Sequence, residues 1–344
     1  MTRFRMSSQR RNGGHRAAAL VGATLLALTA CSRDAAFERQ APDVSVTEAP
    51  PVTLPHERSG LAFDKAHPEP ARVTIDAAAA LADWCTALAD RLHSVARADC
   101  ASGFELTGHE SVHGRPITVR PVPASARTPR GRVLLIGGTH GDELTSVSLV
   151  FWWLSWLEAT GSAYHWRIIP AMNPDGLFAR PAQRVNANGV DLNRNLPTPG
   201  WETASRDYWR DTGRSERRFP GDAAASEPET RWLVDEIEHY RPDVIVTLHA
   251  PYGVLDYDGE PAPPPRLGPL ELNRLGVFPG SLGNYGARYL DIPVVTVELT
   301  HATRMPAADQ ARAMLRDLTR WLDSSIAPHV RQAQRRREER ASGG

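Results

Sequence analysis

The sequence predicts an α/β protein in which helices cover both faces of one sheet. Short apolar runs typical of buried strands alternate with segments whose apolar residues recur every three or four positions, as they do in helices. This alternation favours a layered α/β fold, in which ligands bind beyond the strand ends. The 344 residues are enough for one large domain with extensions, or for two domains.

The elements are expected in the following order. A first helix is predicted at residues 75–93, and a first strand follows it. Strands are predicted at residues 111–120, 133–136, 166–171, 244–248 and 294–297. Further helices are predicted from residue 144 and at residues 226–240 and 306–322.

Local signals refine these elements. At the helix of residues 226–240, Ser226 and Glu229 are expected to form a capping box, with Pro228 in the first turn. Residues 195–225 contain glycine, proline and charge without a clear period, which predicts a long loop. Residues 329–344 are expected to form a charged, frayed tail.

The first 30 residues have the features of a secretory signal, because arginines precede an apolar run too short to span a bilayer comfortably. Leu28-Thr29-Ala30-Cys31 resembles a bacterial lipobox, which implies a lipidated Cys31; an ordinary cleaved signal is the alternative. The lipid would hold the protein on the periplasmic side of a bacterial membrane, and by resemblance to sorting rules Ser32 favours the outer membrane. Residues 31–72, rich in proline and charge, are interpreted as a tether.

If Cys31 is lipidated, Cys85 and Cys100 remain. In an oxidising compartment a disulfide between them is the economical prediction, and two separate buried thiols are the alternative. A bridge across so short a loop stabilises by roughly 3 kcal/mol, and here it would staple a small helical segment at residues 73–113. The formal net charge is zero, which gives no electrostatic case for a nucleic-acid partner. The oligomeric state is left open.

Polar residues stand at the ends of three predicted strands. His140 and Glu143 lie three apart where the strand at 133–136 gives way to a helix, and His249 ends another strand. Imidazole and carboxylate at such a corner can bind zinc, although the pair alone more often has a surface or capping role. Glu298 follows the apolar run V-V-T-V, where a buried carboxylate is costly without a partner such as a cation.

In this order, these residues resemble the zinc carboxypeptidase family. The shared pattern is H-x-x-E, N-P-D-G, an arginine, N-R, a distant histidine and a glutamate near the C-terminus. The resemblance covers about residues 114–322 and is closer to the murein peptide amidase branch. The stretches that match this branch are H-G-D-E, G-V-D-L-N-R-N, S-E-P-E-T and P-G-S-L-G-N. It implies a mixed-sheet zinc carboxypeptidase-like fold, with a catalytic domain at residues 114–328.

The resemblance implies a metal centre and a base. His140, Glu143 and His249 would hold one Zn²⁺ per chain and leave a fourth position for water, as in catalytic zinc sites. Glu298 would take a proton from that water and later pass one to the leaving amine.

The resemblance also implies substrate contacts. Arg184 would stabilise the oxyanion; Arg180 is its competitor, but its distance from the Asn-Arg pair suits the family less well. Asn193 and Arg194 would grip the substrate carboxylate. Asp191 can orient a ligand histidine, and the N-P-D-G segment is interpreted as a turn that positions the arginine loop.

The implied activity is zinc-dependent hydrolysis of the γ-D-glutamyl–meso-diaminopimelate amide of murein peptides. One alternative is an N-acyl amino acid deacylase resembling the aspartoacylase branch, but N-P-D-G and P-G-S-L-G-N favour the amidase. Another is a lipoprotein that binds wall peptides without cutting them. Digestive carboxypeptidases carry a mobile tyrosine shortly before the position of Gly280-Ser281; this chain has none there, and Tyr252 and Tyr285 are candidate substitutes.

Overall fold

The structure, a computed structural model, describes residues 77–101 and 103–342. The predicted secretory signal, the predicted lipidation site Cys31 and the tether at residues 31–72 lie outside the described residues. Within the described part of the chain, no helix has both the length and the apolar character that a membrane crossing requires.

One mixed sheet of seven strands organises the molecule, in the order β1-β2-β4-β3-β5-β9-β6. Strands β4, β3, β5 and β9 are parallel, and antiparallel pairs complete both edges. The strands are β1 (Glu105–Glu110), β2 (Pro116–Val122), β3 (Arg132–Ile136), β4 (His165–Ile169), β5 (Val244–His249), β6 (Val254–Asp258) and β9 (Val294–Glu298). A separate two-stranded sheet pairs β7 (Arg266–Leu267) with β8 (Leu270–Glu271).

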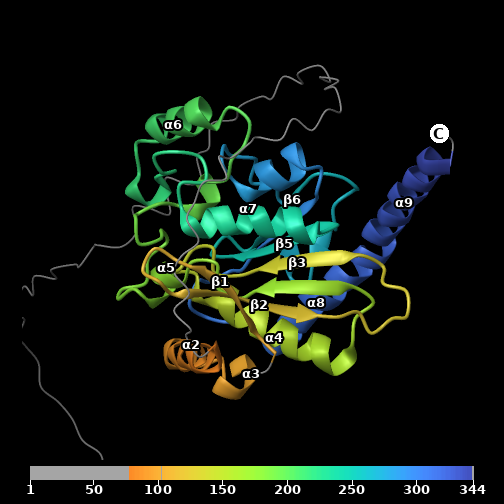
Figure 1. Cartoon of the computed structure of the whole chain (residues 1–344), viewed down its shortest axis with the longest axis horizontal. Helices are drawn as coiled ribbons and strands as arrows, with labels where there is room; N and C mark the ends of the chain where they lie inside the picture. Colours follow the sequence, from red (N-terminus) through yellow and green to blue (C-terminus); the bar gives the residue numbers. More distant parts are fainter. Residues whose placement is uncertain (1–76, 102, 343–344) are drawn as a thin grey trace, which may run out of the picture. The chain divides into compact units, whose positions relative to one another are not determined.

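Helices cover both faces of this sheet, as the sequence predicts. Figure 1 shows α7 on one face and α4 and α8 on the other. The longer helices are α2 (Ala77–Arg91), α4 (Leu144–Thr160), α6 (Trp201–Asp211), α7 (Pro228–Tyr240), α8 (Ala308–Trp321) and α9 (Ala327–Ser342). Two short ones are α3 (Arg97–Ala101) and α5 (Pro174–Phe178). The central strands read as continuous apolar runs because neither of their faces meets water.

Each face of the sheet has its own apolar core. On one face, α4 and α8 bury residues such as Leu154 and Leu318 against the strands. On the other, α7 contributes Trp232 and Ile237, and Tyr285 packs beside them. These two cores hold the parallel strands side by side, so that their carboxyl ends meet at one edge.

The first helices join the same core as the rest of the sheet. Cys85 in α2 and Cys100 in α3 form a disulfide with an S–S distance of 2.06 Å. Both cysteines are buried, and Phe104, just after them, packs against Phe151 of α4 with ring centroids 5.5 Å apart. The helical segment therefore packs directly on α4.

The predicted first strand is partly wrong. Residues 111–115 form a turn between β1 and β2, closed by a hydrogen bond from Ser111 N to Arg115 O of 2.8 Å. Gly114 in this turn has φ +72°, a conformation that few other residues adopt. The expected strand is therefore the second arm of a hairpin whose first arm, β1, has too little apolar alternation to be seen.

Two other segments are more ordered than predicted. The expected loop at residues 195–225 contains helix α6, whose first residue, Trp201, is only 2% exposed. The expected frayed tail is helix α9, which continues to Ser342. Its arginine, glutamine, glutamate and alanine residues are good helix formers, and this local preference outweighs the lack of an apolar face.

Candidate active site

The candidate residues meet where three neighbouring strands end. His140 follows β3, His249 ends β5 and Glu298 ends β9, and these strands are adjacent in the sheet. His249 and Glu298 are direct partners in the β5–β9 register. Between β3 and His140 the chain reverses at Gly138, where φ is +63° and a Cβ would meet Val147 of α4 at 2.8 Å. The same turn places Glu143 immediately before α4.

Three side chains converge that could act as metal ligands. Among the described residues, His140, Glu143 and His249 offer ligand atoms that all lie within 4.8 Å of one another, and all three are buried. The Nδ1 of His140 lies 2.8 Å from Glu143 Oε1, and the Nδ1 of His249 lies 3.0 Å from Glu143 Oε2. The two Nδ1 atoms are 3.1 Å apart. Ligand atoms of a tetrahedral zinc ion with bonds of 2.0–2.1 Å are about 3.3 Å apart, so the set fits zinc.

Hydrogen bonds alone do not account for the close approach of His140, Glu143 and His249, because Asp191 takes up the N–H of His140. Its Oδ1 lies 3.2 Å from His140 Nε2, which can donate a proton to it. Neutral His140 then presents a lone pair on Nδ1, which faces both the carboxylate of Glu143 and the ring nitrogen of His249. A shared cation resolves this opposition, and Asp191 orients the ring as a carboxylate behind a ligand histidine does.

Asp191 also holds Arg184. The Nε of Arg184 donates to Asp191 Oδ2 at 3.0 Å, and its Nη1 lies 3.6 Å from Glu143 Oε1. Burial opposes ionisation of Asp191, but Arg184 and His140 hold its pKa well below the usual value. The guanidinium of Arg184 therefore lies beside Glu143 of the His-Glu-His group, whereas Arg180 is exposed.

The N-P-D-G segment positions Arg184, although it is the start of helix α5 rather than a turn. Asn173 caps this helix by accepting from Gly176 N at 2.8 Å. Its Nδ2 donates to the carbonyl of Arg184 at 3.1 Å. One side chain thus anchors both the helix and the loop that carries the arginine.

Glu298 is a buried carboxylate with one free oxygen. Only 6% of the residue is exposed, and its Oε2 has no hydrogen-bond partner in the described part of the chain. The backbone N–H of Tyr252 donates to this carboxylate. Burial raises the pKa of Glu298 to about 7, although His249 opposes the shift. The free oxygen is available to a proton donor at the zinc site.

Arg194 presents a buried cation beside this site. It is 7% exposed, its Nη1 donates to the carbonyl of Asn193 at 2.7 Å, and its Nε has no hydrogen-bond partner among the described residues. Its guanidinium carbon lies 4.7 Å from the ring centroid of Phe278. A desolvated cation with a free donor favours an anionic ligand such as a carboxylate.

The P-G-S-L-G-N segment holds Asn193 and Arg194 in place. Leu282 N donates to Asn193 Oδ1 at 2.8 Å. Gly280 has φ +71°, and a Cβ there would collide with the carbonyl oxygen of Arg194. Glycine at this position is therefore required by the close approach of the two backbones.

Two glutamates of the S-E-P-E-T motif support the loop that carries Arg184 and Asp191, a role that the sequence did not indicate. Glu227 Oε2 accepts from Asn186 Nδ2 at 2.7 Å and from Asn188 Nδ2 at 2.8 Å. The predicted capping box is wrong, because Glu227 is the N-cap residue and makes no side-chain capping bond. Glu229 instead accepts from Asn186 Nδ2 at 3.1 Å and from Val112 N at 3.3 Å. It is fully buried, and this environment outweighs the local capping signal.

The variant Glu229→Gln is expected to reduce the loss of stability with rising pH. Burial raises the pKa of Glu229 from 4.5 to about 7. As pH rises through this window, the unfolded chain releases the proton while the folded chain keeps it. The free energy of unfolding of the wild type therefore falls, by about 3 kcal/mol from this group, and this loss is absent in the variant. Chemical denaturation of both proteins at about pH 4 and pH 8 measures the difference; parallel pH profiles would contradict it.

The two tyrosines that could replace the missing substrate-capping tyrosine differ in their positions. Tyr285 is 1% exposed and belongs to the core under α7, so it has no freedom to cap a substrate. Tyr252 is 45% exposed and adjoins Glu298 through its backbone.

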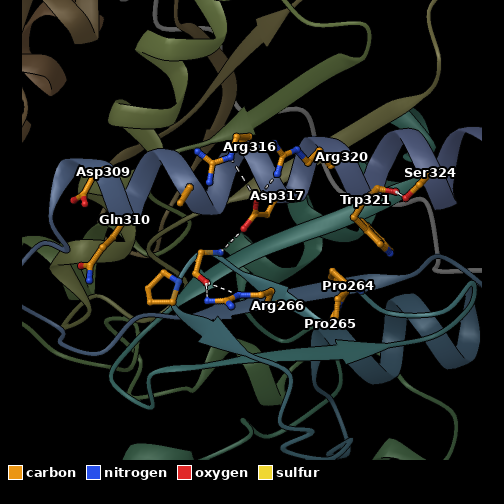
Figure 2. Close-up of a pocket in the computed structure, with 13 residues that line it drawn as sticks. Pro264, Pro265, Arg266, Asp309, Gln310, Arg316, Asp317, Arg320, Trp321 and Ser324 are labelled. Carbon is orange, nitrogen blue, oxygen red and sulfur yellow. Dashed lines mark hydrogen bonds and ion pairs between the residues drawn. The ribbon is translucent and has the colours of Figure 1, made fainter.

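A separate surface pocket lies away from these residues. Figure 2 shows its lining residues on α8 and on the segment around β7. Its volume is about 800 Å³. Asp317 accepts from Gly268 N at 2.9 Å, and Arg316 and Arg320 both pair with the same carboxylate. The pocket contains none of the candidate site residues.

Comparison with known proteins agrees with this geometry. Residues 104–267 match the zinc carboxypeptidase family. The chain is 31% identical over 219 residues to murein peptide amidase A of Escherichia coli (strain K12), across 61% of this chain and 87% of that protein. It is 32% identical over 198 residues to murein peptide amidase A of Vibrio campbellii, across 55% of this chain and 77% of that protein.

A solved structure supports the fold. Bovine thrombin-activatable fibrinolysis inhibitor, in complex with tick carboxypeptidase inhibitor, is similar with a TM-score of 0.50 and 17% identity. The match covers 75% of this chain and 97% of that one. The prediction of a mixed-sheet carboxypeptidase-like fold is thereby confirmed. The cofactor of this family is zinc, and the His-Glu-His group can hold one ion. The chain is a hydrolase and belongs to the zinc carboxypeptidase family.

Proposed function

We propose that this protein hydrolyses the amide between γ-D-glutamate and meso-diaminopimelate in murein peptides. The observation that carries the proposal is a His-Glu-His zinc site with a buried, partly unpaired arginine, Arg194, held beside it. An amide substrate whose leaving residue has a free carboxylate fits this arrangement, because Arg194 can bind the carboxylate while the amide lies at the zinc site. The relatives named murein peptide amidase support this choice of substrate.

Each residue of the site has one task in this reaction. When bound by His140, Glu143 and His249, zinc supplies Lewis-acid polarisation and lowers the pKa of water. Glu298 accepts a proton from the attacking water on its free Oε2 and delivers it to the leaving amine nitrogen. Arg184 places a fixed cation where negative charge develops on the carbonyl oxygen.

The substrate is oriented by a second pair of residues. Arg194 would receive the α-carboxylate of diaminopimelate, and Phe278 holds the guanidinium plane by stacking. Asn193 adjoins it, with its side-chain oxygen already engaged by Leu282 N. Such fixed contacts hold the scissile amide near the zinc ligands and the base.

The cellular setting is part of the proposal and comes from the N-terminal sequence. Lipidation of Cys31 would tether the enzyme to the periplasmic side of a bacterial membrane, with the outer membrane favoured by Ser32. There the catalytic domain would meet murein peptides at the end of a tether formed by residues 31–72.

The test is a comparison of substrates with the purified zinc-loaded protein. We expect release of free diaminopimelate from the murein tripeptide L-alanyl-γ-D-glutamyl-meso-diaminopimelate, measured by chromatography. The same peptide joined through the α-carboxyl of glutamate is the matched control and should be cut far more slowly. Faster turnover of N-acetylaspartate or N-acetylglutamate than of the tripeptide would instead assign the protein to the acyl amino acid deacylases.

A further inference from the structure

Arg194 is a buried cation that has no carboxylate partner. Among the described residues, no aspartate or glutamate forms an ion pair with its guanidinium. Burial lowers the pKa of Arg194 below its usual value, and the charge of Asp191 opposes this shift while that of Arg184 adds to it. A cation in such a place costs free energy before the substrate binds, unless other groups stabilise it.

Two aromatic rings stand where a carboxylate partner is missing. The guanidinium carbon of Arg194 lies 4.7 Å from the ring centroid of Phe278 and 6.0 Å from that of Tyr208. The two ring centroids are 5.4 Å apart and their planes are tilted by 48°, so the rings form two walls of a corner in which the cation lies. The face of an aromatic ring attracts a cation, and the attraction is stronger where water is excluded.

Aromatic walls leave the donors of the guanidinium available to a ligand. A carboxylate partner would accept from the N–H groups of Arg194 and would compete with the substrate, whereas a ring face takes up none of them. The Nη1 of Arg194 donates only to the carbonyl of Asn193, and its Nε has no hydrogen-bond partner in the described chain. The corner therefore stabilises the cation without occupying the groups that would bind a carboxylate.

Helix α6 brings Tyr208 to this corner. The Nε1 of Trp201, the first residue of α6, donates to the carbonyl of Arg194 at 2.8 Å. Tyr208 follows seven residues later, which is about two turns, so it lies on the same face of the helix as Trp201. Just before the helix, the Oγ1 of Thr198 accepts from Gly280 N at 3.0 Å. The start of α6 is thus joined both to Arg194 and to the segment that carries Phe278.

The next aromatic residue of α6 has a different environment. Trp209 packs on Phe219 with ring centroids 5.0 Å apart, and its Nε1 donates to the carbonyl of Ser215 at 2.8 Å. Trp209 therefore anchors α6 to the segment that follows it. The hydroxyl of Tyr208, by contrast, makes no hydrogen bond within the described part of the chain, so its contacts there are those of the ring.

We propose that Tyr208 is a positioning residue for Arg194: together with Phe278, its ring stabilises the unpaired guanidinium and holds it ready for the carboxylate of the released amino acid. The inference rests on the proposed function and adds to it a role for helix α6. Tyr208 acts through Arg194, so its loss should weaken binding of the carboxylate and change KM more than kcat.

The test compares Tyr208→Leu and Tyr208→Phe on two substrates. One is the murein tripeptide, and the other is the same peptide with a carboxamide in place of the carboxylate that Arg194 would bind. We expect the wild type to favour the first by on the order of 100-fold in kcat/KM. Tyr208→Leu should raise KM for the tripeptide about tenfold with kcat within about twofold, and leave the carboxamide unaffected. Tyr208→Phe keeps the ring and should stay within about twofold of the wild type on both.

Tyr289→Leu is the matched control. Tyr289 is 42% exposed, and its ring packs beside Tyr285, with centroids 5.8 Å apart, rather than beside a cation. The control should keep the KM and the preference of the wild type. Melting temperature and zinc content are measured for every variant. Phe278→Leu, also expected to raise KM for the tripeptide about tenfold, replaces Tyr208→Leu if that protein does not fold.

The outcomes separate this inference from the proposed function. Wild-type KM and preference in Tyr208→Leu, equal losses on both substrates, or a loss in Tyr208→Phe as large as in Tyr208→Leu would overturn the positioning role of the ring and leave the amidase standing. Failure of the wild type to cut either peptide would overturn the proposed function, and the inference with it.

Discussion

Glu298→Gln is expected to lower kcat on the murein tripeptide by at least about 1,000-fold with little change in zinc content. Glutamine has the volume of glutamate and can still accept from the backbone N–H of Tyr252. It cannot take a proton from water, and the free Oε2 that would do so is lost. Steady-state kinetics and metal analysis on the same samples measure both quantities.

The control for this variant is Glu271→Gln, which alters an exposed glutamate on β8. It should retain the kcat of the wild type. If Glu298→Gln kept more than about a tenth of wild-type kcat at full zinc occupancy, Glu298 could not be the base, since general-base catalysis contributes about 100- to 10,000-fold.

His249→Ala is expected to remove both zinc and activity. The variant leaves only His140 and Glu143 of the three ligands, and a catalytic zinc site normally uses three protein ligands. We expect less than about a tenth of an equivalent of zinc in the purified variant and no measurable turnover. Atomic absorption gives the zinc content.

Removal of the metal from the wild type tests whether turnover requires zinc. Dialysis against a chelator should abolish turnover, and one equivalent of zinc should restore it in the wild type but not in His249→Ala. The control is His93→Ala, which alters an exposed histidine that is not one of the three candidate ligands, and it should bind zinc normally. If His249→Ala still held a full equivalent of zinc, His249 would not be a zinc ligand.

Much of the fold could be predicted from local pattern. The strands around Val133, Val244 and Val294 and the helix that begins at Leu144 lie close to where the sequence predicted them. They are strongly apolar segments, in which local pattern and tertiary packing agree. The hairpin arm β1 was missed because its residues are mostly exposed and carry little alternation.

The conformation of other segments depends on tertiary contacts that cannot be predicted from the spacing of residues in the sequence. Helix α6 forms in a stretch without a clear period, where Trp201 is buried and its Nε1 donates to the carbonyl of Arg194 at 2.8 Å. Glu229 has the spacing of a capping residue, yet it turns inward to Asn186 and Val112.

The sequence by itself determined the kinds of element, their order and the chemical identity of the candidate site, because periodicity, turn residues and ligand types are local properties of the chain. Only the tertiary structure decided that β3, β5 and β9 are neighbours, and hence that His140, His249 and Glu298 share one edge. Strand order depends on which faces bury against which helices, and that is a property of the whole packed core.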